Sequence, residues 1–543
     1  MIAPLGELVA RGGALVLARG GDARGVIQRM AFEDDAKISP VATPVLAVPG
    51  SEMWVEVRVT NAGLGTWAAA DDDPVRLSYH WYDETGTVVV WDGLRTPIAA
   101  DVLPGRSATV VAGVRVPDAP GFYTLAWDLV RERSGWFAGG EARARGTTVA
   151  VRAEGVTLYG KGWGHGSGLS QWGAQGWALG AAGTRKNGEE IALHYFPGAS
   201  LGQQPPSSPF RVLLSYPSTG CVKRTIHDRA RMWSAGGMRL VNDQQPGVVY
   251  AEVGPDHPLD VHNIGGRLHV SADGGWSWVY IGDAAVTFTP IQWWDPIAIR
   301  EKGLAYRGNI RVQIGATGIA VVNYVSSDDY MQGVLPSEMP AWWEFEALRA
   351  QAIAARTYAA WRQSTAQKRH WDVLDDIADQ CYGGRSHESP RSTAAVQATK
   401  GQILVYQGKP IRALFSSAHG GVSENVGCTL DVERVAGRWT CEADWPYTKP
   451  VEDPAELAAW DKFGAMPHVW DRSFSSDLVR REIIVDYGID IGQLVNMQFA
   501  LSSGGRPVSV KVVGSLGVAD LPGDKFLRHT LGLKSSLVRT APF

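Results

Sequence analysis

The sequence predicts an α+β protein, in which a β-sandwich precedes a larger β-rich domain built around one alanine-rich helix. Short β-type runs separated by turn formers fill residues 41–153, and a second series of such runs fills residues 210–332. Behind the second series, apolar and alanine positions recur every three or four residues from Leu348 to Ala359. This is the spacing of a helix that packs by one face.

The N-terminal part divides at about residue 40. Residues 1–40 are assigned to a leader or linker. They lack the basic start, the uninterrupted apolar run and the small-residue cleavage site of a signal peptide, so no signal peptide is indicated. Residues 41–153 contain runs such as VRLSYHWYD and, after a Pro-Gly turn, YTLAWDLV. The pattern resembles immunoglobulin-like accessory domains. It shows no nucleophile with a neighbouring base, so we expect a spacer or docking module.

Composition narrows the choice of partners. The 543 residues carry a formal charge of −4 without any Lys/Arg block, which argues against a nucleic-acid partner. No stretch is long and apolar enough to span a bilayer. The 22 tryptophans suit surfaces that stack on sugar rings, but packing in cores or at their rims is the preferred explanation for most of them.

The four cysteines fit neither a disulfide-dense scaffold nor a zinc ribbon. Cys428 and Cys441 bracket a loop of hairpin size, so in an oxidising compartment outside the cytoplasm they are close enough in sequence to form a disulfide. If the protein is exported, we expect this bond.

Residues 160–180 form a glycine-rich run, GKGWGHGSGLSQWGAQGWALG. Every second residue at its start is glycine, which lets the backbone approach another chain segment closely. On an extended chain, Lys161, Trp163, His165 and Ser167 would share one face. From Leu169 the pattern changes to that of an amphipathic helix. The run lacks the endings of phosphate-binding loops, so nucleotide binding is not indicated.

Glu338 stands between Pro336 and Pro340, which predicts a rigid turn ahead of the alanine-rich helix. Neighbouring tryptophans would partly desolvate its carboxyl group and raise its pKa, as a general acid near neutral pH requires. Arg356 on the helix is placed to orient a carboxylate. Residue chemistry alone leaves an alternative open, in which Glu338 caps the helix or pairs with Arg356 at the surface.

Several long motifs together resemble the SpoIID/LytB family, which comprises sporulation stage II protein D and the amidase enhancer LytB. They are DYMQGVLPSEMP with EALRAQAIAARTYAAW behind it, DDIADQCYGG, STAAVQATKGQILVYQGKPIRALFSSAHGGVSENV, LRHTLGLKSS and GWGHGSGLSQWGAQGWA. The resemblance implies one SpoIID-type domain over residues 154–543. Its parts are a glycine–histidine segment at 154–202, a β-rich part at 210–332 and a catalytic core at 333–543.

The family implies peptidoglycan chemistry. Its members resemble lytic transglycosylases, which cleave the β-1,4 bond between N-acetylmuramic acid and N-acetylglucosamine in glycan strands and leave 1,6-anhydro ends. Carried over by motif, Glu338 is the catalytic acid/base and Arg356 a supporting residue. The implied sugar contacts are His165, Ser170, Gln171, Gln380 and Tyr382. An extracytoplasmic or cell-envelope location is expected from the family.

One departure from the family concerns metal. Some members carry a cysteine directly before the glutamine that matches Gln380, close to a zinc ion, whereas this chain has Asp379 there and Cys381 on the other side. We therefore predict no metal and no cofactor. His370, Cys381 and His387 remain the alternative metal-binding set.

Two rival functions stay open. The first is a non-catalytic amidase enhancer that binds peptidoglycan and stimulates a separate cell-wall amidase, and the second is a structural surface protein whose sandwich docks to a partner. The motif order also departs from the family, because the glycine–histidine run comes first instead of last. This order predicts a circular permutation, in which VTLYGKGWGHG lies beside SSLVRTAPF and His165 reaches the groove of Glu338.

Overall fold

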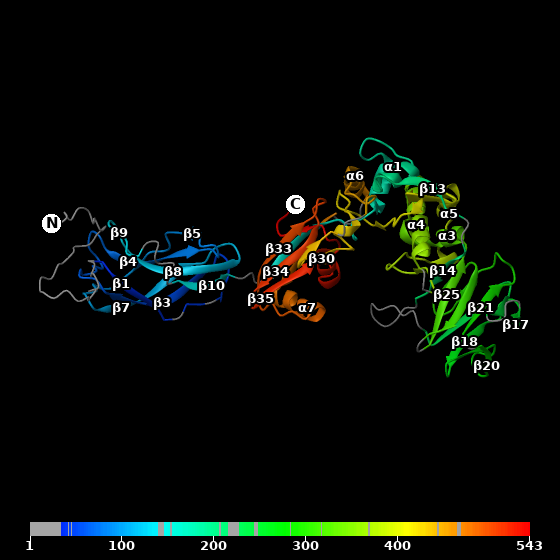
Figure 1. Ribbon diagram of the computed structural model, residues 1–543, viewed down its shortest axis with the longest axis horizontal. Helices are drawn as coiled ribbons and strands as arrows, with labels where there is room; N and C mark the ends of the chain where they lie inside the picture. Colours follow the sequence, from blue (N-terminus) through cyan, green and yellow to red (C-terminus); the bar gives the residue numbers. More distant parts are fainter. Residues whose placement is uncertain are drawn as a thin grey trace, which may run out of the picture. The chain divides into compact units, whose positions relative to one another are not determined.

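The computed structural model describes residues 34–542, except 42, 45, 139–145, 152–154, 206–207, 216–226, 244–247, 283, 316–317, 367–369, 442–444 and 464–467. Its elements are mixed and rich in sheets, which confirms the predicted α+β class (Figure 1). Most of the leader predicted at residues 1–40 lies outside the described residues. No helix among the described residues is long and apolar enough to cross a membrane.

The chain divides into two compact units. The first comprises residues 1–157, 473–498 and 510–521, and the second comprises residues 158–472, 499–509 and 522–543. This division does not follow the boundary predicted at residue 153, because two C-terminal segments group with the N-terminal unit.

Two sheets share one core in the N-terminal part of the first unit (Figure 1). One sheet has the order β1-β3-β7: Ala36–Pro40, Glu52–Asn61 and Ser107–Arg115. The other has the path β2-β10-β8-β4-β5: Leu46–Ala47, Thr147–Val151, Gly121–Arg131, Val75–Tyr82 and Val88–Val90. The buried residues alternate along β3 as the sequence pattern predicted. The assignment of residues 36–40 to a leader is wrong, because they form β1 and pair with β3.

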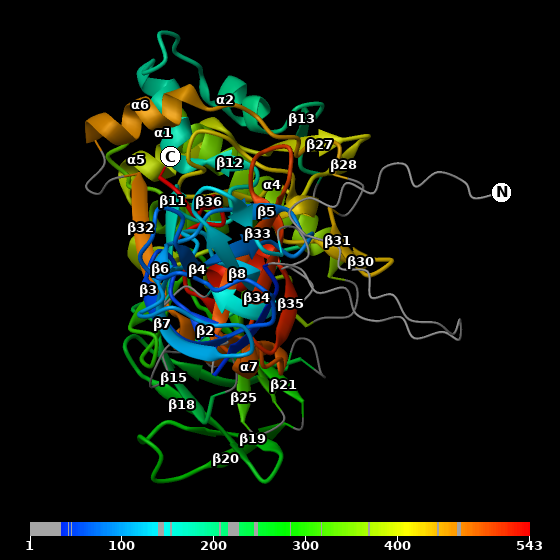
Figure 2. The same ribbon diagram turned by 90° about the vertical axis from the view of Figure 1, so that its left-hand side faces the viewer.

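Two further sheets form the β-rich part of the second unit (Figure 2). The first has the order β17-β16-β21-β24-β25-β14-β26: Val249–Val253, Met238–Asn242, Ala285–Pro290, Asn309–Ile314, Ile319–Val325, Phe210–Leu213 and Val373–Leu374. The second has the order β20-β19-β18-β15-β22-β23: Val279–Gly282, Arg267–Ser271, Leu259–Ile264, Arg229–Trp233, Ile297–Ile299 and Leu304–Tyr306.

Helices pack on these sheets in one continuous core. They are α1 Gln171–Leu179, α2 Gly188–Tyr195, α3 Ser327–Glu338, α4 Phe345–Thr365, α5 Pro390–Ala398 and α6 Pro454–Phe463. The alanine-rich α4 confirms the predicted helix, and its predicted stripe from Leu348 to Ala359 is buried. Alanine side chains are short, so neighbouring elements approach this helix closely.

The glycine–histidine segment enters the second unit through strand β11, Gly155–Lys161. Tyr159 and Gly160 pair antiparallel with Arg539 and Val538 of strand β36, Val538–Arg539. The predicted neighbourhood of these distant segments is therefore confirmed. The circular permutation that suggested it stays a prediction.

Cys428 and Cys441 form a disulfide, with their Cα atoms 4.2 Å apart, as predicted for an exported protein. Cys428 lies at the end of a short 3-10 helix, Val426–Cys428, and is buried. The bond closes a loop whose residues are separated by 13 positions in the sequence.

We expect Cys441→Ser to lower the free energy of unfolding by about 3 kcal/mol, because the open loop gains conformational freedom in the unfolded chain. Denaturant unfolding followed by tryptophan fluorescence measures the change. A reductant is expected to weaken the wild type to the level of the variant and to leave the variant unaffected. Equal stability of the two proteins without reductant would contradict the prediction.

Candidate functional site

Glu338 is the last residue of α3, so the predicted proline-bracketed turn is wrong. Pro336 lies inside this helix, within its last turn. A proline there removes one amide donor, but the helix ends two residues later and the Met339 amide still donates to the Leu335 carbonyl at 3.0 Å. Pro340 then follows the helix end, where proline is common.

The Glu338 side chain is half-buried, and its carboxyl group accepts hydrogen bonds from two neighbouring residues. The Cys381 amide donates to Oε1 at 2.5 Å, and the side chains of Cys381 and Gln171 also bond this carboxyl group. Burial raises the pKa of Glu338 above the ordinary range of a glutamate, and the hydrogen bonds only partly offset this effect. The raised pKa confirms the expectation drawn from the sequence. In the described part of the chain, no other carboxylate perturbs the pKa of Glu338.

Helix α1 clips the loop between α3 and α4 at both of its ends. Gln171 Nε2 donates to the Glu338 carbonyl at 3.0 Å, and one helical turn later Gln175 Oε1 accepts from the Glu344 amide at 2.9 Å. We call Gln171 and Gln175 the glutamine clip. Because residues four apart share one face of a helix, both amides reach the same loop. The structure therefore brings Gln171 and Glu338 together.

Tryptophan rings hold α1 against this loop. The Trp172 ring lies 4.7 Å from that of Trp343 and 5.0 Å from that of Trp460. Trp342, by contrast, is 71% exposed next to the loop. Some tryptophans thus pack the site while at least one presents its ring to solvent.

The alternating glycines approach other segments closely, as predicted, but the chain between them is not an extended strand. Glycines 162, 164, 166 and 168 all have φ between 76° and 114°, a region that side chains disfavour. A Cβ on Gly162 would lie 2.7 Å from the Ala418 carbonyl oxygen, and one on Gly166 would lie 2.3 Å from the Arg506 guanidinium. The prediction that Lys161, Trp163, His165 and Ser167 share one extended face is therefore wrong.

Hydrogen bonds at both ring nitrogens fix His165, one within its own segment and one to Phe415. Nδ1 accepts from the Ser167 amide at 3.1 Å, so Nε2 carries the proton and donates to the Phe415 carbonyl at 3.0 Å. Desolvation and the nearby guanidinium of Arg528 lower the pKa of His165 to about 3. The imidazole is neutral and positions the backbone. Its predicted reach to the groove of Glu338 stays a prediction.

Ser170 is buried and caps α1, where its Oγ accepts from the Gly173 amide at 3.0 Å. The same hydroxyl donates to Glu456 Oε2 at 2.5 Å. Both hydrogen-bonding directions of this hydroxyl are used within the protein. The sugar contact expected for Ser170 is not available in this arrangement.

Gln380 and Tyr382 are also buried and bonded internally. Gln380 Oε1 accepts from the Tyr330 hydroxyl at 3.0 Å, and its Nε2 donates to the Ala355 carbonyl at 3.1 Å. The Tyr382 hydroxyl donates to Asn323 Oδ1 at 2.9 Å. These groups satisfy one another because a buried polar atom without a partner is costly. They support the chain on either side of Cys381 and do not face a sugar.

Arg356 is fully buried and points to the end of α5. Its Nη1 donates to the Thr399 carbonyl at 2.7 Å, and its Nη2 donates to the Val396 carbonyl at 3.2 Å. A guanidinium at the carbonyl end of a helix satisfies groups that have no partner within the helix. The contacts of Arg356 described by the structure do not include Glu338. These contacts do not support the prediction that Arg356 orients a carboxylate at the site. They also do not support the alternative, in which Arg356 forms a surface ion pair with Glu338.

A buried carboxyl pair lies behind Ser170, and sequence reasoning did not predict it. Glu456 accepts from three consecutive amides, those of His419, Gly420 and Gly421, at 2.7, 2.6 and 3.1 Å. Asp453 caps the same helix α6 through the Glu456 amide at 3.1 Å and bonds the Tyr195 hydroxyl. Burial and the negative charge of Glu456 raise the pKa of Asp453 to about 7. An Asp-x-x-Glu spacing before an apolar helix indicates a cap but not this burial.

We expect the pH dependence of stability to reveal Asp453. Its raised pKa means that the folded chain holds the proton more tightly, so this contribution is complete below about pH 4, the range of an ordinary aspartate, and is lost as the pH rises through about 7. Asp453→Asn should flatten this decline in thermal midpoint. Asp471→Asn, at an exposed position of strand β32, Val469–Ser475, is the control. An unchanged slope in the Asp453 variant would contradict the prediction.

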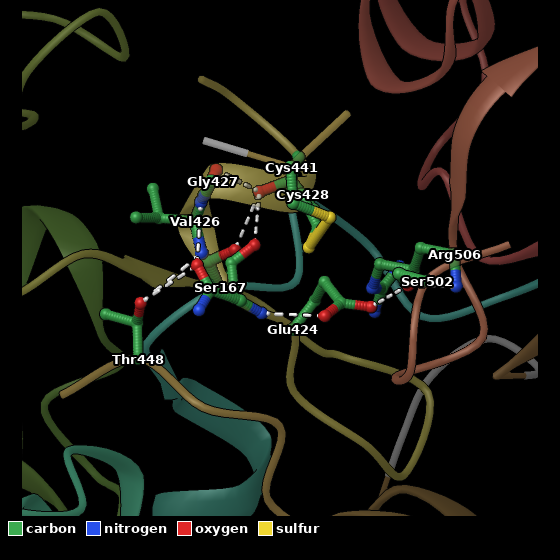
Figure 3. The surroundings of a disulfide bond; sticks show 11 residues. Ser167, Glu424, Val426, Gly427, Cys428, Cys441, Thr448, Ser502 and Arg506 are labelled. Carbon is green, nitrogen blue, oxygen red and sulfur yellow. Dashed lines mark hydrogen bonds between the residues drawn. A yellow bond between two sulfur atoms is a disulfide. The ribbon is translucent and has the colours of Figure 1, made fainter. Parts of the chain in front are cut away.

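The disulfide anchors the loop that receives the glycine–histidine segment (Figure 3). Gly166 O accepts from the Glu424 amide at 2.8 Å, and Ser167 Oγ and Thr429 Oγ1 lie 2.8 Å apart. Figure 3 shows the Glu424 carboxylate turned the other way, toward Ser502, to which it is hydrogen-bonded. The loop thus joins the segment around His165 to a distant part of the same unit.

Among the described residues, no three His, Cys, Asp or Glu side chains lie close enough together to bind one metal ion. The alternative set of His370, Cys381 and His387 is therefore not assembled. His387 instead has its Nδ1 2.9 Å from Ser337 Oγ, and Cys381 is engaged with Glu338.

Known proteins are similar to this chain over the segment that contains Glu338. The family model described as "Stage II sporulation protein" matches residues 315–406, a segment that contains α3, α4, α5 and Glu338. The amidase enhancer of Bacillus subtilis is 46% identical over 94 residues, covering 17% of this chain and 12% of that protein. The stage II sporulation protein D of the same organism is 32% identical over 168 residues, covering 28% of this chain and 44% of that protein.

A third relative, the stage II sporulation protein D of Bacillus amyloliquefaciens, is 29% identical over 242 residues, covering 42% of this chain and 63% of that protein. The chain thus spans between 12% and 63% of the lengths of these three relatives. The segment at residues 315–406, which holds Glu338, thus matches the SpoIID/LytB family.

Proposed function

We propose that the protein is a peptidoglycan lytic transglycosylase that cleaves the β-1,4 bond between N-acetylmuramic acid and N-acetylglucosamine. The observation that carries the proposal is the Glu338 carboxyl group, which burial keeps protonated at higher pH than usual while the Cys381 amide and Gln171 fix its position. A general acid needs these two properties together. No second carboxylate perturbs its pKa among the described residues.

A single carboxyl group suffices for this chemistry. Ordinary glycosidases use two, one to protonate the leaving oxygen and one to act as nucleophile or to activate water. Here Glu338 first gives its proton to the glycosidic oxygen as the bond to the muramoyl anomeric carbon breaks. The resulting carboxylate then takes the proton of the muramoyl 6-hydroxyl, whose oxygen bonds to that carbon. The product is a 1,6-anhydro end, and Glu338 is protonated again.

Arg356 and the internal pair Gln380 and Tyr382 enter the proposal as structural supports. They hold α5 and the chain around Cys381, which in turn positions the Glu338 carboxyl group. Of the residues predicted to contact sugar, Gln171 is the one that we propose lies next to the glycosidic bond that is cleaved.

Product analysis on glycan strands without stem peptides tests the proposal. Mass spectrometry is expected to find 1,6-anhydromuramoyl ends with the wild type, whereas a hydrolase would leave reducing ends that carry one more water. If wild type and Glu338→Gln are both inert but still bind the strands, the non-catalytic amidase enhancer is the correct function. The 46% identity with the amidase enhancer of B. subtilis favours it as the second candidate.

The cleavage rate is expected to fall as the pH rises through the raised pKa of Glu338. The first step requires the protonated carboxyl group of Glu338. Because burial raises its pKa, this group stays protonated to higher pH than an ordinary glutamate. A profile of rate against pH at saturating glycan measures this. A rate that rises steadily with pH over the same range would exclude Glu338 as the general acid.

The accessory features fit an extracytoplasmic role. We propose that the two N-terminal sheets form an immunoglobulin-like module for docking or spacing, with a cell-wall amidase as one candidate partner. The disulfide supports a location in an oxidising compartment.

A further inference from the structure

One face of the second sheet of the β-rich part presents a cross-strand row of polar and aromatic side chains. Arg229 of β15 pairs with His262 of β18, His262 with His269 of β19, and His269 with Tyr280 of β20. We call these four residues the outer row. Figure 2 shows the four strands side by side.

The outer row faces solvent because each member alternates with a buried neighbour. All four members are exposed or half-buried, and Tyr280 is 49% exposed. The residues next to them in the chain point to the core: Ala230, Val261, Leu268 and Ile281. The row crosses three gaps between strands, which makes it roughly 14 Å long. Such a row is longer than a single sugar.

Rings and guanidinium groups share this face. The Tyr280 ring centroid lies 5.8 Å from that of His269 and 5.7 Å from the Arg267 guanidinium, and the Trp278 ring lies 5.7 Å from that of His262. Flat rings of this kind bind the apolar faces of sugars, and Arg binds carboxylates.

A hydrogen-bonded turn directly precedes Trp278. The Asp273 carboxylate accepts from the Ser271 hydroxyl at 2.6 Å and from the amides of Trp276 and Ser277, both at 3.0 Å. The backbone leading to Trp278 is therefore already ordered when a ligand stacks on the ring. The same turn displays Trp276, which is 92% exposed.

Arginines flank the rings on this face. Asp260, in the neighbouring cross-strand pair, is bonded to Arg231 at 2.7 Å, so its charge is matched. Arg229 and Arg267 add positive charge at two places around the rings. A ligand that combines sugar rings with regularly spaced negative groups complements this surface better than a neutral glycan or an apolar peptide.

We propose that the outer row, with Trp278 and Arg267, is an auxiliary binding surface for a glycan strand that carries carboxylate groups. The identity of the glycan rests on the proposed function, since each N-acetylmuramic acid of a strand without stem peptides bears one free lactyl carboxylate. The surface uses none of the residues that hold Glu338. It keeps a long strand bound while the cleavage site acts on another part of it.

The test measures binding by full-length protein in the Glu338→Gln background, so that cleavage does not interfere. The acidic probe is a glycan strand without stem peptides, and the neutral probe is a chitin oligomer of equal length. Tyr280→Ala and His262→Ala are expected to weaken binding of both probes by about tenfold each. Arg229→Ala combined with Arg267→Ala is expected to weaken the acidic probe only, and to remove its preference over chitin.

Trp293→Ala is the matched control, because Trp293 is 80% exposed in the same unit but does not belong to the outer row. Trp293→Ala is expected to bind both probes as tightly as the Glu338→Gln background. All variants are expected to have the thermal midpoint of that background. Equal losses in Trp293→Ala and Tyr280→Ala, or equal wild-type affinity for the two probes, would overturn the proposal. The proposal would also fail if the outer-row variants bound glycan as tightly as the background but no longer bound a protein partner.

Failure of this proposal and failure of the proposed function give different results. With Glu338 restored, the outer-row variants are expected to cleave short glycans at the wild-type rate but to release long strands sooner. If the wild type cleaves nothing, the proposed function fails while the binding comparison still decides the outer row.

Discussion

Glu338→Gln is expected to lower the rate of glycan cleavage on the order of a thousandfold, because glutamine neither donates the proton to the leaving oxygen nor takes one from the 6-hydroxyl. Glutamine has the same shape, and its oxygen still accepts from the Cys381 amide that binds Oε1 in the wild type. The fold should therefore persist. Release of anhydromuramoyl products over time measures the rate.

Glu344→Gln is the matched control for this experiment. Glu344 lies at the other end of the same loop, and its side chain makes no capping bond to α4. Its activity is expected to match the wild type. A Glu338 variant that retains a tenth or more of the wild-type rate would show that another group supplies the proton.

Gly168→Ala is expected to cost about 3 kcal/mol of folding stability in the unit that contains it. The φ of Gly168 is 76°, and an added Cβ would lie 2.0 Å from the Leu414 carbonyl oxygen. That oxygen accepts from the Leu169 amide at 2.9 Å, so relieving the clash breaks the bridge that brings α1 to its place. The estimate combines a left-handed backbone with an overpacked contact.

Gly183→Ala separates these two causes. Its φ is 89°, but nothing lies within 4 Å of an added Cβ, so only the backbone effect of about 1 kcal/mol applies. Chemical unfolding of both variants, followed by fluorescence, gives the comparison. Equal losses at the two positions would mean that the close approach to Leu414 does not matter.

The sequence predicted those parts of the fold that local periodicity determines. The alternation of β3 and the three- and four-residue spacing of α4 each require only neighbouring residues, and both are present. The alternate glycines of the glycine–histidine run likewise predicted a close backbone approach. Their positive φ values were not predictable, because they depend on the segment around Ala418 that the run contacts.

The errors have a common physical origin. Pro336 suggested a turn, but proline in the last turn of a helix loses only one hydrogen bond. Arg356 and Gln380 were placed at the site by their motifs, but their polar groups bond carbonyls within the core. Which partner a buried polar side chain finds is decided by tertiary packing, and residue type does not reveal it.

The glutamine clip belongs to a part of the fold whose segments the ribosome makes at very different times. The clip reaches Glu338 from α1, and α1 lies downstream of strand β11, whose partner β36 is translated long after α3. The ribosome thus completes the acid-bearing helix before the partner strand of β11 exists. A nascent chain therefore carries the Glu338 carboxyl group before β11 can pair with β36.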